Sequence, residues 1–182
     1  MLPLNDDRWR TLKVYFGMAK DLPARIERWA AAIGTERESA AFTDLSQRVL
    51  HQFTITDAAY AVVPHVVANL PRVAPERRVD YFDTLSLVEA ARESFDAPEC
   101  PRYLRAAYTS AVRDARALAI EALSAPWQPR EFRYVLSAVA GLCGHPALAE
   151  LLWNIEARCE CEYLDRLKSG GYFGGSERPN GP

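Results

Sequence analysis

The sequence is poor in cysteine, in long apolar runs and in any excess of one charge, and each shortage excludes a class of protein. Its four cysteines are Cys100, Cys143, Cys159 and Cys161, too few for a disulfide scaffold in a chain of 182 residues. Cys159 and Cys161 lie two positions apart on a predicted helix, where their side chains point in different directions and cannot bridge easily. We therefore expect reduced thiols and a cytoplasmic location.

The pattern also lacks a membrane span and a signal peptide. The longest apolar run, residues 58–68, is interrupted by Pro64 and His65 and is well short of the ~20 residues that a membrane span needs. The first residues show no basic segment followed by an apolar one. We expect a chain that has no membrane partner and carries no signal peptide.

The charges nearly balance, with 22 Lys and Arg against 24 Asp and Glu and a net charge of −2. A nucleic-acid-binding domain usually has a basic excess, so we do not expect a nucleic acid as the partner. Hydrophobic residues make up 49% of the chain, which is enough for the core of one soluble domain.

Motifs for catalysis, metals and cofactors are missing as well. The three histidines, His51, His65 and His145, have no His-x-x-x-His spacing. The Cys159-x-Cys161 pair has no second pair at zinc-finger spacing, and no Gly-x-Ser-x-Gly, P-loop or dinucleotide fingerprint is present. We expect no catalytic residue, no cofactor and no metal, and we assign the histidines to hydrogen bonds with turn carbonyls or helix ends.

What the sequence does contain is helical periodicity. Apolar residues recur at helical spacing in about eight segments, which we expect at residues 6–16, 21–34, 35–51, 57–70, 75–95, 101–123, 129–143 and 146–168. The segment 57–70 is apolar at almost every position, so its helix should be covered on most sides, and Pro64 should kink it. Thr35 and Glu38 form a capping-box pattern at the start of the third segment. No strand pattern is evident.

These helices predict an all-α, HEAT-like αα-hairpin solenoid. Pairing them gives three units, residues 36–70, 75–123 and 129–168, whose spacing of roughly 40–50 residues is close to the ~40–47 of HEAT and armadillo repeats. We expect one domain over residues 1–168, in which residues 1–34 form a helical cap. The Gly-rich residues 169–182 should be a flexible tail.

Three separated stretches resemble a group of bacterial HEAT-like proteins. Residues 51–67 are similar to a pattern of His-Gln-Gly, Ala-Ser/Ala-Tyr and Pro-aromatic/His-Leu, with Phe53 where that pattern has Gly. Residues 15–23 resemble the entry segment of those proteins, and residues 144–149 resemble their closing Gly-His-x-x-Leu-Ala. The resemblance implies an α-solenoid scaffold and no particular catalytic residue. Some helical-repeat proteins of this size are immunity proteins that neutralise a toxin domain encoded beside them.

We therefore expect a protein-binding module, an immunity protein whose partner is a toxin domain. Candidate contact residues are a loop tryptophan, a nearby arginine and an acidic group near the end of the chain: Trp127, Arg130, Glu156, Glu160, Glu162 and Asp165. Trp127 could anchor a partner or pack under its own turn, and the acidic group could fill the basic cleft of a toxin that acts on nucleic acid or be a solvated helix face.

Two alternatives stay open. One is a non-catalytic adaptor. The other is a DNA-directed enzyme of the helical-repeat base-excision glycosylase type, with Asp80, Asp83 or Asp114 as its carboxylate. Its basic groove would be formed by the clustered arginines Arg72, Arg77, Arg78, Arg102, Arg105, Arg113, Arg116, Arg130 and Arg133.

Overall fold

The computed structural model describes residues 1–52, 54–94 and 96–154, and this part of the chain is mostly helical. Its seven α-helices are α1 (Leu22–Ala32), α2 (Glu38–Val49), α3 (Ala59–Asn69), α4 (Arg78–Arg92), α5 (Arg102–Ala122), α6 (Pro129–Leu142) and α7 (Pro146–Asn154). Short 3-10 turns lie at Asp7–Arg10, Ala19–Asp21, Leu70–Arg72 and Pro75–Arg77. The predicted helical class is confirmed. The predicted extension of the last helix to 168 and the tail 169–182 lie outside the described residues.

Proline, glycine and capping side chains set several helix ends. Pro129 begins α6, where its missing N–H costs nothing. The Gln128 and Glu131 side chains form a capping box there. At the other end Gly144 has φ +84°, and the His145 N–H donates to the Ala140 carbonyl at 2.9 Å. This left-handed closure satisfies free carbonyls of the last turn, as glycine commonly does after a helix.

The predicted helix at residues 6–16 is wrong, and so is the expectation that the chain has no strands. After the 3-10 turn, β1 (Lys13–Val14) pairs antiparallel with β2 (Gly17–Met18), and Gly17 turns the chain with φ +97°. A second hairpin joins β3 (Leu50–His51) to β4 (Thr54–Ile55). Two-residue strands are too short to produce the alternation that identifies a strand in a sequence.

Main-chain hydrogen bonds fix the first hairpin to the helices beside it. The Tyr15 N–H donates to the Arg48 carbonyl at the end of α2, at 3.2 Å. Ahead of α3, the Ala58 N–H donates to the Lys13 carbonyl at 3.3 Å, and the Lys13 N–H donates to the Asp57 carboxylate at 2.5 Å. The first hairpin is therefore braced by residues that precede and follow the second hairpin in the sequence.

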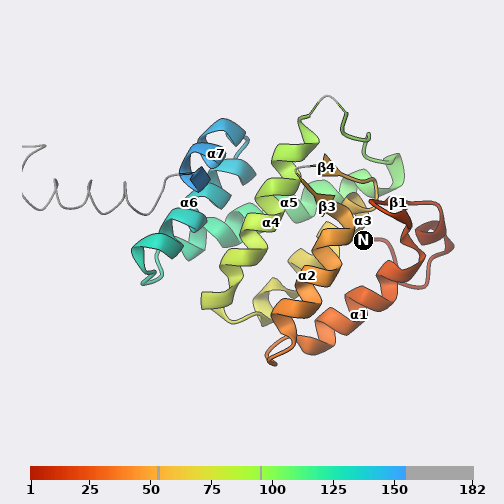
Figure 1. Ribbon diagram of the computed structural model, residues 1–182, viewed down its shortest axis with the longest axis horizontal. Helices are drawn as coiled ribbons and strands as arrows, with labels where there is room; N and C mark the ends of the chain where they lie inside the picture. Colours follow the sequence, from red (N-terminus) through yellow and green to blue (C-terminus); the bar gives the residue numbers. More distant parts are fainter. Residues whose placement is uncertain (53, 95, 155–182) are drawn as a thin grey trace, which may run out of the picture.

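The helix α3 lies in the core, as predicted from its composition. Every residue from Ala59 to Val67 is buried, and its main neighbour is α5. The other extensive helix contacts are α1 with α2, α4 with α6, and α6 with α7. Figure 1 shows α6 and α7 at one end of the molecule and α1 and α2 toward the other. No helix among the described residues is both long and apolar enough to cross a membrane.

Candidate functional site

The first hairpin presents an exposed apolar surface that we call the hairpin patch, formed by Tyr15, Phe16, Met18 and His51. Phe16 is 73% exposed, Met18 41% and Tyr15 38%. The Tyr15 ring lies 4.6 Å from the Phe16 ring, edge to face, and 4.4 Å from the His51 ring, between centroids. Such contacts order the aromatic side chains without burying them. Lys13 and Lys20, both exposed, lie on either side of residues 15–18 in the sequence.

A second site is a cavity of about 640 Å³ between the end of α4, the segment before α5, and α5 itself. We call it the arginine cavity because four guanidinium groups line it, those of Arg92, Arg105, Arg113 and Arg116. The carboxylates that line it are those of Glu89 and Glu99, and Cys100 supplies a free thiol. Two of the arginines also pair with carboxylates outside the lining, Arg92 with Glu93 and Arg113 with Asp114. Arg105 and Arg116 have no such partner among the described residues, and their charges suit an anionic ligand.

Glu89 is already bound within the wall of the arginine cavity. The Tyr108 hydroxyl donates a short hydrogen bond to its carboxylate, and the Arg92 Nε donates to the same oxygen at 3.3 Å. Burial, followed by the Glu89 charge, raises the pKa of Tyr108 above its usual range. Beside it the Tyr60 hydroxyl donates to the Pro98 carbonyl at 2.7 Å, and burial raises the pKa of Tyr60 to about 12. Both tyrosines therefore stay protonated as hydrogen-bond donors at neutral pH.

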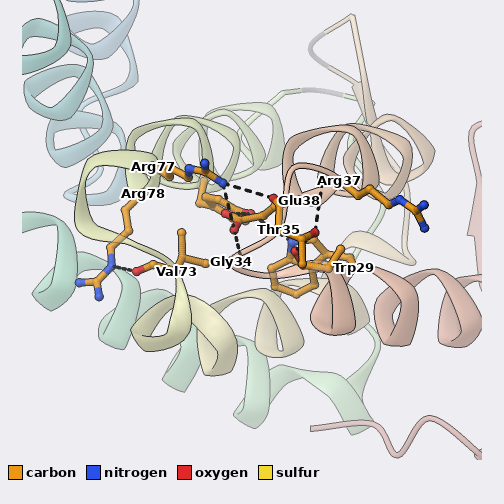
Figure 2. Close-up of polar contacts among 10 residues, drawn as sticks. Trp29, Gly34, Thr35, Arg37, Glu38, Val73, Arg77 and Arg78 are labelled. Atoms are coloured by element: carbon orange, nitrogen blue, oxygen red, sulfur yellow. Dashed lines mark hydrogen bonds and ion pairs between the residues drawn. The ribbon is translucent and has the colours of Figure 1, made fainter.

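A third site is a polar cluster centred on Glu38 at the start of α2, and this residue is almost fully buried (Figure 2). Glu38 is 2% exposed. Its carboxylate accepts from the Gly34 N–H at 2.6 Å and from the Tyr81 hydroxyl at 3.0 Å. The Tyr81 oxygen in turn accepts from the Trp29 indole N–H at 3.1 Å. Arg77, whose side chain is 53% exposed, reaches the same carboxylate at 3.6 Å.

The capping box predicted for Thr35 and Glu38 does not form as expected. The helix α2 begins at Glu38 and not at Thr35. The Thr35 hydroxyl accepts from the Arg37 N–H at 3.2 Å, and Glu38 reaches back to Gly34. The 3-residue spacing was correct, but the chain makes a turn there before the helix starts, so each side chain binds one position earlier than predicted.

The Glu38 cluster borders a cavity of about 450 Å³ that Asp80 and Asp83 also line. Burial raises the pKa of Asp83 to about 7, and the negative charge of Asp80 adds to the effect. Asp114, the third carboxylate of the glycosylase alternative, lies on α5 and borders another cavity with Met1 and Pro64. The structure therefore does not bring Asp80, Asp83 or Asp114 into the arginine cavity.

The arginines of the predicted basic groove are divided among several places. Arg105, Arg113 and Arg116 share the arginine cavity. Arg72 and Arg78 instead donate to the main-chain carbonyls of Ala30 and Val73, at 2.9 and 3.0 Å. Arg77 belongs to the Glu38 cluster. Arg102 is exposed and does not line the cavity, and Arg133 is buried.

Of the predicted contact residues, only Trp127 has a described side chain. It is half-buried, and its indole N–H donates to the Ala122 carbonyl at 2.6 Å, so it packs under its own turn. The Arg130 side chain and the residues Glu156, Glu160, Glu162 and Asp165 lie outside what the structure describes. The hairpin patch, Arg92 and Glu89 were not singled out in the sequence analysis.

Each histidine has a different environment. The buried His65 ring lies 2.9 Å from the Leu2 carbonyl through Nε2, and burial lowers its pKa. His145 closes α6 through its main chain, and His51 stacks in the hairpin patch. Among the described residues, no group of three or more His, Cys, Asp or Glu side chains could hold a metal ion.

Comparison with known proteins adds no relative. No protein-family model, curated protein or solved structure matches the chain.

Proposed function

We propose that this protein is a helical-repeat module that binds another protein through the hairpin patch, and that its partner is a bacterial toxin domain that it neutralises as an immunity protein. The observation that carries the proposal is the exposed, braced set of apolar side chains at the first hairpin. Phe16 is 73% exposed. Covering its ring with a partner would stabilise the complex by about 25 cal/mol per Å² of apolar area buried.

The bracing of the hairpin supports a role in recognition. Hydrogen bonds tie its turn, through Tyr15, to the end of α2, and its first strand, through Lys13, to the residues before α3. A patch held in this way loses little conformational entropy when it binds. Aromatic side chains also dominate the binding energy of most protein interfaces.

The packing of alternate helices supports the helical-repeat part of the proposal. The main partner of α3 is α5, and that of α4 is α6, as happens when αα units stack on one another in a solenoid. Within the three predicted units, only α6 and α7 pack extensively on each other. The immunity role rests on the resemblance of residues 15–23, 51–67 and 144–149 to bacterial HEAT-like proteins, which is an argument from similarity of fold.

Co-expression with the toxin domain encoded beside the gene tests the proposal. We expect the two chains to co-elute on size-exclusion chromatography and the protein to restore growth of cells that express the toxin. Failure to form a complex, together with failure to protect, would refute the immunity role.

The patch itself is tested by Phe16→Ala. Loss of a central aromatic contact should weaken the complex by about 2 kcal/mol, or roughly thirtyfold in Kd, with an unchanged circular dichroism spectrum because Phe16 is not part of the core. Ile120→Ala on α5, where the side chain is 48% exposed, is the matched control and should leave Kd unchanged. Equal effects of the two variants would exclude the hairpin patch as the contact surface.

A further inference from the structure

We propose that the arginine cavity is a binding site for a small oxyanion with more than one charged group, separate from the hairpin patch and independent of any protein partner. Its size of about 640 Å³ is within the usual range of about 300–1,000 Å³ for small-molecule sites. Guanidinium groups bind phosphates and carboxylates through paired N–H donors.

Part of the positive charge of the cavity is available to a ligand. Arg92 pairs with Glu89 and Glu93, and Arg113 pairs with Asp114, whereas Arg105 and Arg116 have no carboxylate partner among the described residues. Glu89 is 13% exposed at its side chain and is already satisfied by Tyr108 and Arg92. The Arg105 guanidinium forms no hydrogen bond or ion pair with another described residue. Arg116 donates its Nε to the Leu142 carbonyl at 2.8 Å, which holds the side chain in place without using its two terminal nitrogens.

Cys100 and two of the arginines, Arg92 and Arg105, line the same cavity. Cys100 precedes α5, and although burial raises the pKa of its thiol, the nearby positive charges of Arg105 and Arg92 act in the opposite direction. Arg92 comes from the end of α4 and Arg105 from the start of α5. The Cys100 thiol therefore lies within the electrostatic influence of both guanidinium groups. A change in its reactivity can reveal an anion bound beside it.

The spacing of the arginines indicates more than one charged group in the ligand. Arg105, Arg113 and Arg116 follow one face of α5, and the first and last are separated by about 16 Å along its axis. A ligand with charged groups at two ends can contact more of this row of arginines than a single phosphate can. The tyrosines in the wall, Tyr60 and Tyr108, are 1% and 5% exposed, so they offer no stacking surface for the bases of a nucleic acid.

The test uses Cys100 in a chain whose other three cysteines are replaced by serine. Alkylation by the anion iodoacetate is compared with alkylation by neutral iodoacetamide, and N-acetylcysteine gives the reference ratio. We expect the ratio at Cys100 to exceed the reference by about threefold or more and to fall as salt is added. Arg105→Gln should abolish the excess. Arg102→Gln, one turn earlier on the same helix and outside the cavity, should leave it unchanged.

Pyrophosphate and citrate then serve as ligands, and each is measured by protection of Cys100 from iodoacetamide and by calorimetry on the unmodified chain. We expect saturable binding that weakens about threefold or more in Arg105→Gln and Arg113→Gln but not in Arg102→Gln. The stronger of the two ligands identifies phosphate or carboxylate as the preferred group. The proposal is overturned if neither pyrophosphate nor citrate binds by either measurement, or if Arg102→Gln weakens binding as much as Arg105→Gln does. A single-stranded oligouridylate tests the nucleic-acid alternative, and binding of this oligonucleotide alone would also overturn the proposal.

Discussion

The Glu38 cluster makes the sharpest stability prediction, through the substitution Glu38→Gln. The change keeps the shape of the side chain but turns one of its two acceptor oxygens into an N–H₂ donor. In the folded protein one oxygen faces the Gly34 N–H and the other faces the Tyr81 O–H. Whichever way the amide is turned, one of these donors loses its acceptor.

The Tyr81 hydroxyl cannot repair the loss by turning around. Its oxygen could accept from the new amide, since it has a second lone pair beside the one used by Trp29. Its own hydrogen would then have no acceptor. A buried donor left unsatisfied costs about 1–3 kcal/mol, so Glu38→Gln should lower the free energy of unfolding by about 2 kcal/mol. The contact with Arg77 contributes little, because that side chain is 53% exposed, and Arg77→Gln should cost less than about 1 kcal/mol.

Urea unfolding followed by circular dichroism measures these differences, and the slope with denaturant should not change. Glu36→Gln is the control, because Glu36 is exposed and lies two residues away. It should stay within about 0.5 kcal/mol of the parent. Tyr81→Phe combined with Glu38→Gln should cost less than the sum of the two single changes, since the residues share one hydrogen bond. A Glu38→Gln protein as stable as Glu36→Gln would show that the reasoning is wrong.

Two further predictions concern the helix α4. A Cβ at Gly141 would lie 2.0 Å from the Ser86 Oγ and 3.1 Å from the Ser86 Cβ. Gly141→Ala should therefore destabilise the protein by about 1–3 kcal/mol in thermal unfolding, and adding Ser86→Ala should recover part of the loss. A Gly141→Ala protein at least as stable as the parent would contradict this contact. Burial raises the pKa of Asp83 to about 7, so the folded chain holds the carboxyl proton more tightly than the unfolded chain does. The protonated carboxyl therefore contributes stability that is fully present below about pH 4 and is lost as the pH rises through 7. Asp83→Asn should therefore be more stable than the parent at alkaline pH, with a difference that shrinks on acidification; a difference that does not change with pH would exclude the proposed titration.

The helices could be predicted from the sequence because their signals are long and repeated. The six segments from residue 21 to residue 143 each contain a helix close to its expected bounds. The composition of α3 alone predicted its burial, since a helix that is apolar on every side has no face suited to water. In the segment 35–51 the error was confined to the ends, where capping geometry depends on the turn that precedes the helix.

The candidate sites were harder to predict because they depend on contacts between distant segments. Glu38 and Tyr81 are 43 residues apart, and nothing in the local pattern around Glu38 distinguishes a buried carboxylate from an exposed one. The arginine cavity likewise combines Arg92 and Glu89 from α4 with three arginines of α5. The sequence showed the arginines as a cluster, but only the packing of the helices separates those that share a cavity from those that bind main-chain carbonyls.

The hairpin patch was missed for a reason that follows from the wrong helix at residues 6–16. In a helix, Trp9, Leu12 and Phe16 would lie on one face, and Phe16 would be part of the core. The structure keeps Trp9 and Leu12 buried at 2% exposure each, but the chain then turns through Gly17 and carries Phe16 outward. Phe16 is therefore predicted to be a core residue if the segment is a helix and an exposed contact residue if it is a hairpin. The hairpin is held by hydrogen bonds to Arg48, Asp57 and Ala58, so the exposure of Phe16 is a property of the tertiary fold. The search for a protein partner should begin at the hairpin patch.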